Sequence, residues 1–170
     1  DGNSANSNRG LWDTRARLNA NAKVNANTEV FLQFQARGVW GNAGASAGTR
    51  AAYGAAPAND KVDDVGLHQG YLTLKGFMGQ AVDLKLGRQE IVFDGHRILG
   101  NTIWTQGGQT NDAVRFDHRA GNHEITVAYI EALENGNVNA GQDLNNGTYV
   151  VRAATQGVMG GNLAGYFLVH

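Results

Sequence analysis

Alternation of apolar and polar residues is the feature of this sequence that most restricts its fold. From Trp12 to Val24, residues of one parity are mostly apolar, and residues of the other parity are polar or charged. Successive side chains of a β-strand point to opposite faces, so this stretch predicts one long strand with an apolar and a polar face. The polar face carries large charged side chains in mid-strand, among them Arg15 and Arg17.

The same alternation returns along the rest of the chain and predicts about eight strands and no helix. The sequence has 24 glycines and one proline. This composition supports an all-β fold class, because glycine costs about 1 kcal/mol at each position inside a helix. The expected strands cover residues 12–24, 30–37, 70–77, 82–86, 113–117, 124–130, 148–155 and 162–170.

Alternation fits two kinds of β-protein. In a soluble barrel or sandwich the apolar face turns inward, whereas in an outer-membrane barrel it meets lipid and the polar face lines the lumen. The cleanest strands run about 10 residues or more, which suits a tilted membrane strand. The apolar face is rich in alanine, and a water-filled lumen would solvate the mid-strand charges. We therefore expect an antiparallel transmembrane β-barrel in the cell outer membrane of a Gram-negative type cell, with outer-membrane lipid as a partner.

The lengths of the connections predict how the strands are oriented across the membrane. The connections at 41–66 and 94–111 are long, and those at 25–27, 78–81 and 120–122 are short. Bacterial barrels have short periplasmic turns and longer extracellular loops, so the long connections are expected on the outer rim. Both ends of the chain then fall outside, whereas a complete barrel starts and ends in the periplasm. We expect residues 1–170 to be part of a single barrel domain of a larger up-and-down barrel, with no separate second domain.

Composition excludes several functions. The chain has 14 basic and 15 acidic residues, so it lacks the basic excess that a nucleic-acid partner requires. Cysteine is absent, and the five histidines show no metal-ligand spacing. No Ser/His/Asp set can be assembled either, so we expect no enzyme activity, no metal and no cofactor.

One region resembles a known family. The series Leu84-Lys85-Leu86-Gly87-Arg88-Gln89-Glu90 is followed by Gly95, Arg97, Gly100 and Trp104, and then by Asp112-Ala113-Val114-Arg115-Phe116. Over roughly Leu72–Asp117 this resembles the alginate-export family of outer-membrane porins. The resemblance implies a large barrel that passively transports or exports an anionic or polar solute through an arginine-lined pore. The solute would be small and anionic or polysaccharide-like, and the family label does not identify it as alginate.

Strand parity selects the basic side chains that would line such a pore. A ladder of them would raise the local concentration of anions over cations. The alternative is that interleaved acids pair with these cations across the strands. The pore-lining set comprises Arg15, Arg17, Arg37, Lys75, Lys85, Arg115 and Arg152.

Arg88 and Glu90 break the alternation, since parity would turn them toward lipid, where a charge at mid-bilayer costs about 2–4 kcal/mol. Either Gly87 marks a bulge that returns them to the lumen, or they lie above the apolar band and hold the 94–111 loop against the wall. We expect the second arrangement, with Arg88 or Arg97 paired to Glu90 or Asp112.

The favoured function is therefore an outer-membrane porin for anionic or polar solutes. Two alternatives stay open. One is a scaffold barrel that encloses a partner, such as other outer-membrane subunits. The other is a soluble β-barrel or sandwich that binds a small apolar ligand.

Overall fold

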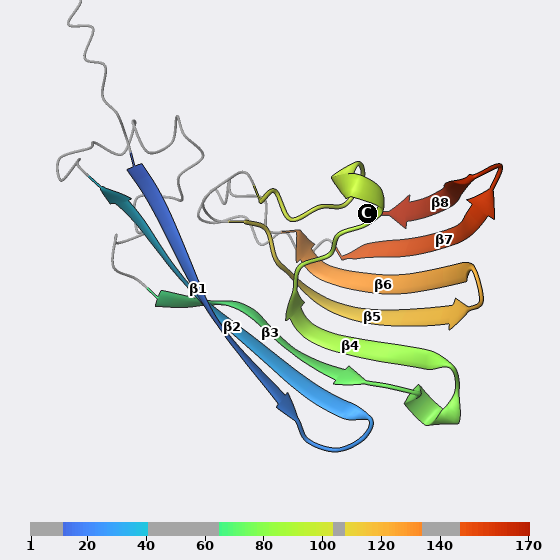
Figure 1. Cartoon of the computed structure of the whole chain (residues 1–170), viewed down its shortest axis with the longest axis horizontal. Coiled ribbons are helices and arrows are strands. Elements are labelled where there is room, and N and C mark those ends of the chain that lie inside the picture. The colour runs from blue at the N-terminus through green and yellow to red at the C-terminus, as the bar shows by residue number, and fades with distance from the viewer. Residues whose placement is uncertain (1–11, 41–64, 104–107, 134–146) are drawn as a thin grey trace, which may run out of the picture.

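The computed structural model describes residues 12–40, 65–103, 108–133 and 147–170, with the side chains of 12–13, 37–40 and 132–133 left out. In this part of the chain, eight strands form one sheet in the order β1 to β8, and each strand is antiparallel to the next (Figure 1). The strands are β1 (Trp12–Lys23), β2 (Thr28–Trp40), β3 (Val65–Leu74), β4 (Val82–Gln89), β5 (Asn111–Ala120), β6 (His123–Leu133), β7 (Thr148–Val158) and β8 (Gly161–Val169).

This arrangement confirms the all-β class and the antiparallel, up-and-down order that the alternation predicts. The described residues contain two short 3-10 turns, η1 (Phe77–Gly79) and η2 (Asp94–His96), and no α-helix. The sheet is open, with β1 and β8 at its two edges. Within the described ranges, no helix has the length and apolarity that a membrane crossing requires.

The third predicted strand has the wrong bounds. It was expected at 70–77, but β3 begins at Val65 and ends at Leu74. Gly76 takes a left-handed conformation at φ 61°, and Phe77 lies in η1. The strand ends at Leu74, because the left-handed Gly76 turns the chain into η1.

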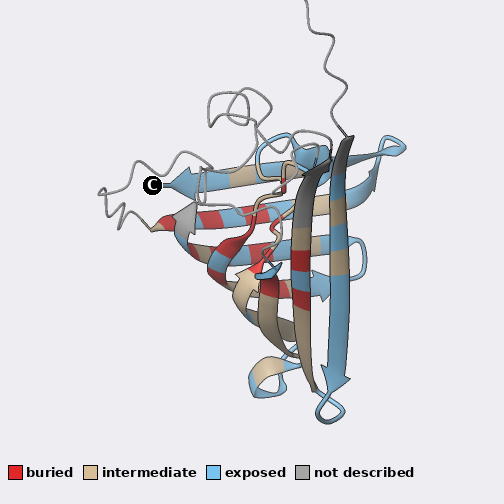
Figure 2. Ribbon diagram, turned by 90° about the vertical axis from the view of Figure 1, so that its left-hand side faces the viewer, coloured by how far each residue is buried: buried red, intermediate tan, exposed pale blue. Residues whose placement is uncertain are grey.

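The two faces of the curved sheet differ as the parity predicts. The convex face carries an apolar belt in which Leu18 lies opposite Phe34, Leu72 opposite Leu86, and Leu84 opposite Phe116. Several belt side chains are exposed, Leu18 by 72% and Leu86 by 47%. Buried residues instead gather on the concave face, where chain segments cross the sheet (Figure 2). The apolar side of this sheet therefore packs against nothing in the described structure.

The small core lies on the concave side. Residues 90–103, which we name the inner segment, leave β4 and run across the concave face (Figure 1). The long connection at 94–111 was expected to form a loop on the outer rim. This expectation is wrong for residues 94–103, which lie across the concave face. Ile91 and Phe93 of the inner segment are buried against side chains of β5, β6 and β7. The core consists of Ile91, Phe93, Ala113, Ala128, Ile130 and Val150.

A bulge in β3 alters the inner face. Gln33 of β2 lies opposite Gln69, but the next residue, Phe34, lies opposite Leu67. His68 is thus an extra residue in β3, and both His68 and Gln69 are buried on the concave side. A bulge of this kind re-aims a side chain, and here it brings a histidine toward the inner segment.

Candidate functional site

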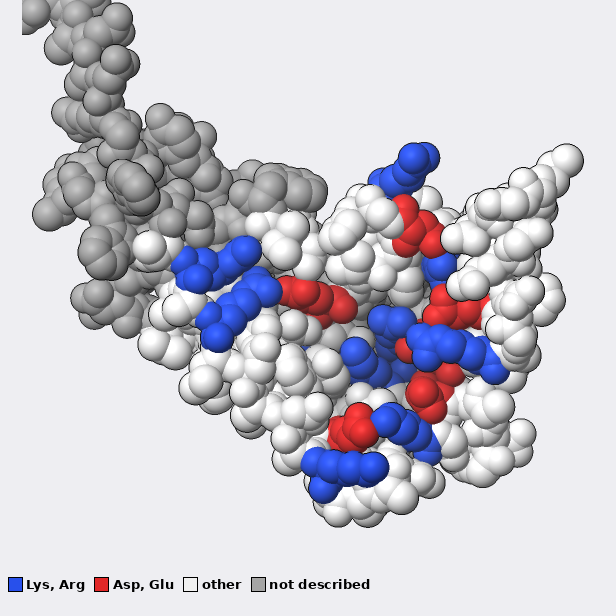
Figure 3. All heavy atoms as spheres, in the orientation of Figure 1, with Lys and Arg blue, Asp and Glu red and all other residues white. Residues whose placement is uncertain are grey.

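Charged side chains gather in the hollow of the concave face, where Lys and Arg alternate with Asp and Glu (Figure 3). The inner segment crosses one part of this face and leaves another part open. Three groups of residues make up the candidate site. Two of them attach the inner segment to the sheet, and the third lines an open pocket.

Glu90 is the centre of the first group, the Glu90 cluster of Arg17, His68, Glu90 and Asn101. Glu90 Oε1 lies 3.1 Å from Arg17 Nη1 and 2.9 Å from His68 Nε2. Asn101 Nδ2 donates to Glu90 Oε2 at 2.7 Å. The cluster therefore joins β1, β3 and both ends of the inner segment.

His68 Nε2 also lies 2.9 Å from Arg17 Nη2. His68 Nε2 cannot accept a hydrogen bond from Arg17 and donate one to Glu90 at the same time. The tautomer of His68 therefore determines which of these two hydrogen bonds forms. Burial by itself raises the pKa of Glu90, but hydrogen bonds from His68 and Asn101, with the charge of Arg17, outweigh it and lower the pKa to about 2. Glu90 is therefore a carboxylate at neutral pH.

A chain of amides extends the Glu90 cluster across the first three strands. The Glu90 backbone N–H donates to Gln69 Oε1 at 3.0 Å. Gln69 Nε2 donates to Gln33 Oε1 at 3.0 Å, and Gln33 Nε2 donates to Asn19 Oδ1 at 2.8 Å. Buried amides that bond one another fix their own orientation, so this chain holds the end of β4 at one place on the sheet.

The second group, the Asp94 cluster, consists of Asp94, Glu124, Arg152 and Tyr166. Arg152 donates to both Asp94 oxygens, from Nε at 2.7 Å and from Nη2 at 2.6 Å. Its Nη1 donates to Glu124 at 2.7 Å, and the Tyr166 hydroxyl also donates to Asp94. The hydrogen bonds from Arg152 lower the pKa of Asp94 to about 2; burial opposes this shift, and the hydrogen bond from Tyr166 and the charge of Arg152 add to it.

Two guanidinium groups lie close to the ring of Phe93. The Arg115 carbon Cζ is 4.9 Å from the ring centroid of Phe93, and that of Arg152 is 5.1 Å away. Both distances are within the range of a cation–π contact. The inner segment is thus held by an ion pair and by an aromatic ring that two arginines contact.

Arg152 was expected to line an open pore, and this is wrong. Its side chain is only 8% exposed, because the inner segment covers it. Arg152 instead anchors the inner segment through Asp94, which is the role that the sequence predicted for Arg97. Arg97 is exposed, and none of the described residues forms an ion pair with it.

Arg88 and Asp112 form a two-bond ion pair, with Nε to Oδ1 at 3.0 Å and Nη2 to Oδ2 at 2.8 Å. This is one of the expected pairings, but the two residues face each other across β4 and β5, so the pair joins two strands and does not anchor the loop. The loop is held through Glu90, whose basic partner is Arg17. The chain leaves the sheet after Gln89, which carries Glu90 to the concave side.

The other cations of the predicted pore-lining set whose side chains are described lie on the concave face. Arg15 Nη1 donates to the Ile103 carbonyl at 3.4 Å. Lys75 pairs with Glu29 at 2.6 Å, and Arg115 pairs with Asp117 at 2.9 Å. The side chain of Arg37 lies outside the described residues. Acids therefore pair with several of these cations, as the alternative interpretation of the charge ladder proposed.

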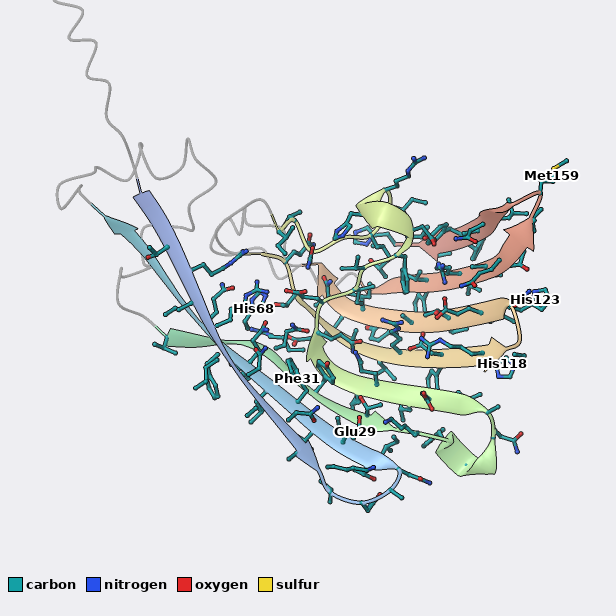
Figure 4. The ribbon with its side chains drawn as sticks, in the orientation of Figure 1. Glu29, Phe31, His68, His118, His123 and Met159 are labelled. Atoms are coloured by element: carbon teal, nitrogen blue, oxygen red, sulfur yellow. The ribbon has the colours of Figure 1, made fainter. Side chains whose placement is uncertain are left out.

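The third group lines a pocket of about 290 Å³ on the open part of the concave face. Phe31 and Tyr71 stack there with ring centroids 5.0 Å apart, and Lys85 Nζ lies 4.0 Å from the Tyr71 centroid. Figure 4 shows Phe31 and Glu29 on β2 beside this region. The lining residues are Asn21, Glu29, Phe31, Tyr71, Thr73, Asp83, Lys85, Arg115, Asp117 and Arg119.

The histidines do not assemble a metal centre in the described structure, where no three metal-ligating side chains lie together. His118 and His123 lie at the end of the sheet with the short turns, away from His68 (Figure 4). His170 Nδ1 is 2.8 Å from Thr148 Oγ1.

Comparison of the chain with protein-family models and with curated proteins found no match. The resemblance to the alginate-export porins therefore has no support from these comparisons. It enters the functional argument only as a proposal.

Sequence reasoning missed His68, Asp94, Asn101 and Tyr166. A signal for His68 was present, because the apolar residues of β3 have odd numbers at Val65 and Leu67 but even numbers at Leu72 and Leu74. Such a switch of parity marks an inserted residue. No comparable local signal pointed to Asp94, Asn101 or Tyr166.

Proposed function

We propose that this chain forms part of the wall of an outer-membrane β-barrel channel for small anionic or polar solutes. The observation that carries the proposal is the sidedness of the sheet. Its exposed convex face bears the apolar belt, and its concave face bears the buried glutamines, the Glu90 and Asp94 clusters and the pocket. This is the inverse of a soluble barrel, in which large apolar side chains fill the interior.

The exposed belt supports contact with lipid. It continues in register across the sheet, from Leu18 and Phe34 through Leu86 and Val114 to strands β6 to β8, where Val127 and Phe167 are 44% and 66% exposed. Large contiguous apolar surfaces of this kind mark membrane or protein contacts. The strands of 8 to 13 residues have the length that a tilted crossing of a bilayer needs.

The inner segment would narrow the lumen of such a channel. It covers the concave face of β5 to β7, so solutes would pass along the open side, beside the pocket. The porin resemblance supports the same class of function. In this arrangement the Glu90 and Asp94 clusters set the width of the channel by holding the segment against the wall.

The ion pairs affect the selectivity that we expect. Arg17, Arg115 and Arg152 each have an acidic partner, so the anion preference comes from the small surplus of basic charge. Removing basic charge should leave the acids uncompensated and invert the preference.

Planar-bilayer recording in a salt gradient tests this proposal with the intact protein. Joint replacement of Arg15, Arg17 and Arg37 by Gln should shift the reversal potential toward cation preference. Salt above about 0.1 M should reduce the difference, because it screens the charges. A protein that stays monomeric without detergent and forms no channels would overturn the proposal. Conducting channels of unchanged selectivity in the triple variant would refute the anion preference.

A further inference from the structure

Lys85 differs from most of the other basic side chains of the concave face. Arg17, Lys75, Arg115, Arg119 and Arg152 each lie within ion-pair distance of a carboxylate. No such partner for Lys85 occurs among the described residues. Its Nζ lies instead 4.0 Å from the centroid of the Tyr71 ring and lines the open pocket.

The neighbours of Lys85 increase its need for a negative partner. On the adjacent strand it lies directly opposite Arg115, and like charges at opposed positions destabilise a sheet. Asp117 shares its carboxylate with Arg115 at 2.9 Å and with the Thr126 hydroxyl at 2.7 Å. An anion bound between Lys85 and Arg115 would relieve this repulsion.

The wall beside Lys85 is aromatic. Phe31 and Tyr71 are stacked 5.0 Å apart, and the hydroxyl of Tyr71 makes no hydrogen bond within the described structure. The pocket of about 290 Å³ is at the small end of ligand sites, so it suits a molecule with a single ring. Aromatic rings favour contact with other aromatic rings.

We propose that this pocket binds the carboxylate of a small aromatic acid. The carboxylate lies on the Lys85 ammonium with Arg115 nearby, and the ring contacts the Phe31–Tyr71 pair. An acidic sugar needs more hydrogen-bonding groups than an aromatic acid, and two of the charged side chains that line the pocket are already paired. Glu29 is already bonded to Lys75, and Arg119 is already bonded to Glu124. The inference rests on the proposed function in taking the concave face to be a surface that solutes reach.

Calorimetric titration of the intact, detergent-purified protein tests the site with four probes: benzoate, acetate, benzyl alcohol and glucuronate. Benzoate should bind at least about tenfold more tightly than acetate, which lacks the ring, and than benzyl alcohol, which lacks the charge. Lys85→Gln should weaken benzoate binding by about tenfold or more. Lys23→Gln, which removes the same charge from the same face outside the pocket, should change it less than twofold.

Two further variants separate binding from folding. Lys85→Arg keeps the charge and should retain most of the benzoate affinity, whereas Phe31→Leu should weaken benzoate binding without affecting acetate. Unchanged benzoate affinity in Lys85→Gln would overturn the site, and glucuronate binding as tight as benzoate would overturn the aromatic class. Equilibrium binding requires no pore, so a protein that binds benzoate but forms no channel would refute the channel and leave the site intact.

Discussion

Gly87 adopts a backbone conformation that other residues rarely take, with φ 121°. A Cβ at this position would lie 2.4 Å from the carbonyl oxygen of Gly70, on the neighbouring strand. Gly87 therefore allows β3 and β4 to approach closely, two residues before the chain leaves the sheet after Gln89.

Gly87→Ala should lower the free energy of unfolding by about 1–3 kcal/mol, through backbone strain and the contact with Gly70. Urea titration in detergent micelles measures the change. Gly165→Ala is the matched control, because its added Cβ meets no atom within 4 Å, and it should have little effect. Equal losses in the two variants would contradict the account of Gly87.

Arg152 is the residue on which the Asp94 cluster depends. Arg152→Met keeps much of the side-chain volume but leaves Asp94 and Glu124 without their buried partner, which should cost about 2–4 kcal/mol. Arg119→Gln removes a more exposed ion pair with the same Glu124 and should cost under about 1 kcal/mol. The same urea titration measures the loss in the free energy of unfolding for both variants. Similar losses would show that Arg152 does not anchor the inner segment.

The position of the inner segment on the sheet is determined by the contacts of a few of its side chains. Ile91 and Phe93 supply its apolar contacts, and Glu90 and Asp94 supply its charged ones. Because both carboxylates have a pKa of about 2, well below their ordinary values of 4.5 and 3.8, the attachment depends on pH.

Acid should release the inner segment before the sheet unfolds. A lowered pKa in the folded state contributes stability that is fully present above about pH 4.5 and is lost as the pH falls through about 2. Amide hydrogen exchange at residues 91–99 should therefore accelerate between pH 4.5 and 2, after correction for intrinsic rates, with β6 as the internal control. Release with a midpoint above pH 5 would mean that other groups control the attachment.

The whole molecule is organised by the contrast between its two faces. Most charged groups of the concave face pair with one another, whereas the convex belt packs against nothing within the described structure. If lipid covers the belt, a charge there carries a penalty that a charge on the concave face does not.

Leu72→Arg, in the middle of the belt, should destabilise the lipid-embedded protein by about 2–4 kcal/mol. Asn21→Arg places the same side chain on the exposed concave face at the pocket rim and should cost much less. Unfolding from lipid vesicles measures both. Equal effects of the two substitutions would argue against a lipid-facing belt.

The strands and their two faces could be predicted from the sequence, because the face of a residue in a strand depends only on its place in the local alternation. Eight runs of alternating residues became eight neighbouring strands, and Leu18, Leu72 and Leu84 lie together on the apolar face that the alternation predicts. The concave positions of Lys75, Lys85 and Arg115 follow from the same local rule.

The inner segment and its partners were decided only by the tertiary structure. Glu90 meets Arg17 from 73 residues away, and Asp94 meets Arg152 from 58 residues away. Each contact depends on how far the sheet curves, on the bulge at His68 and on the turn of the chain after Gln89, and local periodicity encodes none of these. The alternation determines which face a side chain occupies, but the partner it finds across that face depends on the folding of the whole chain.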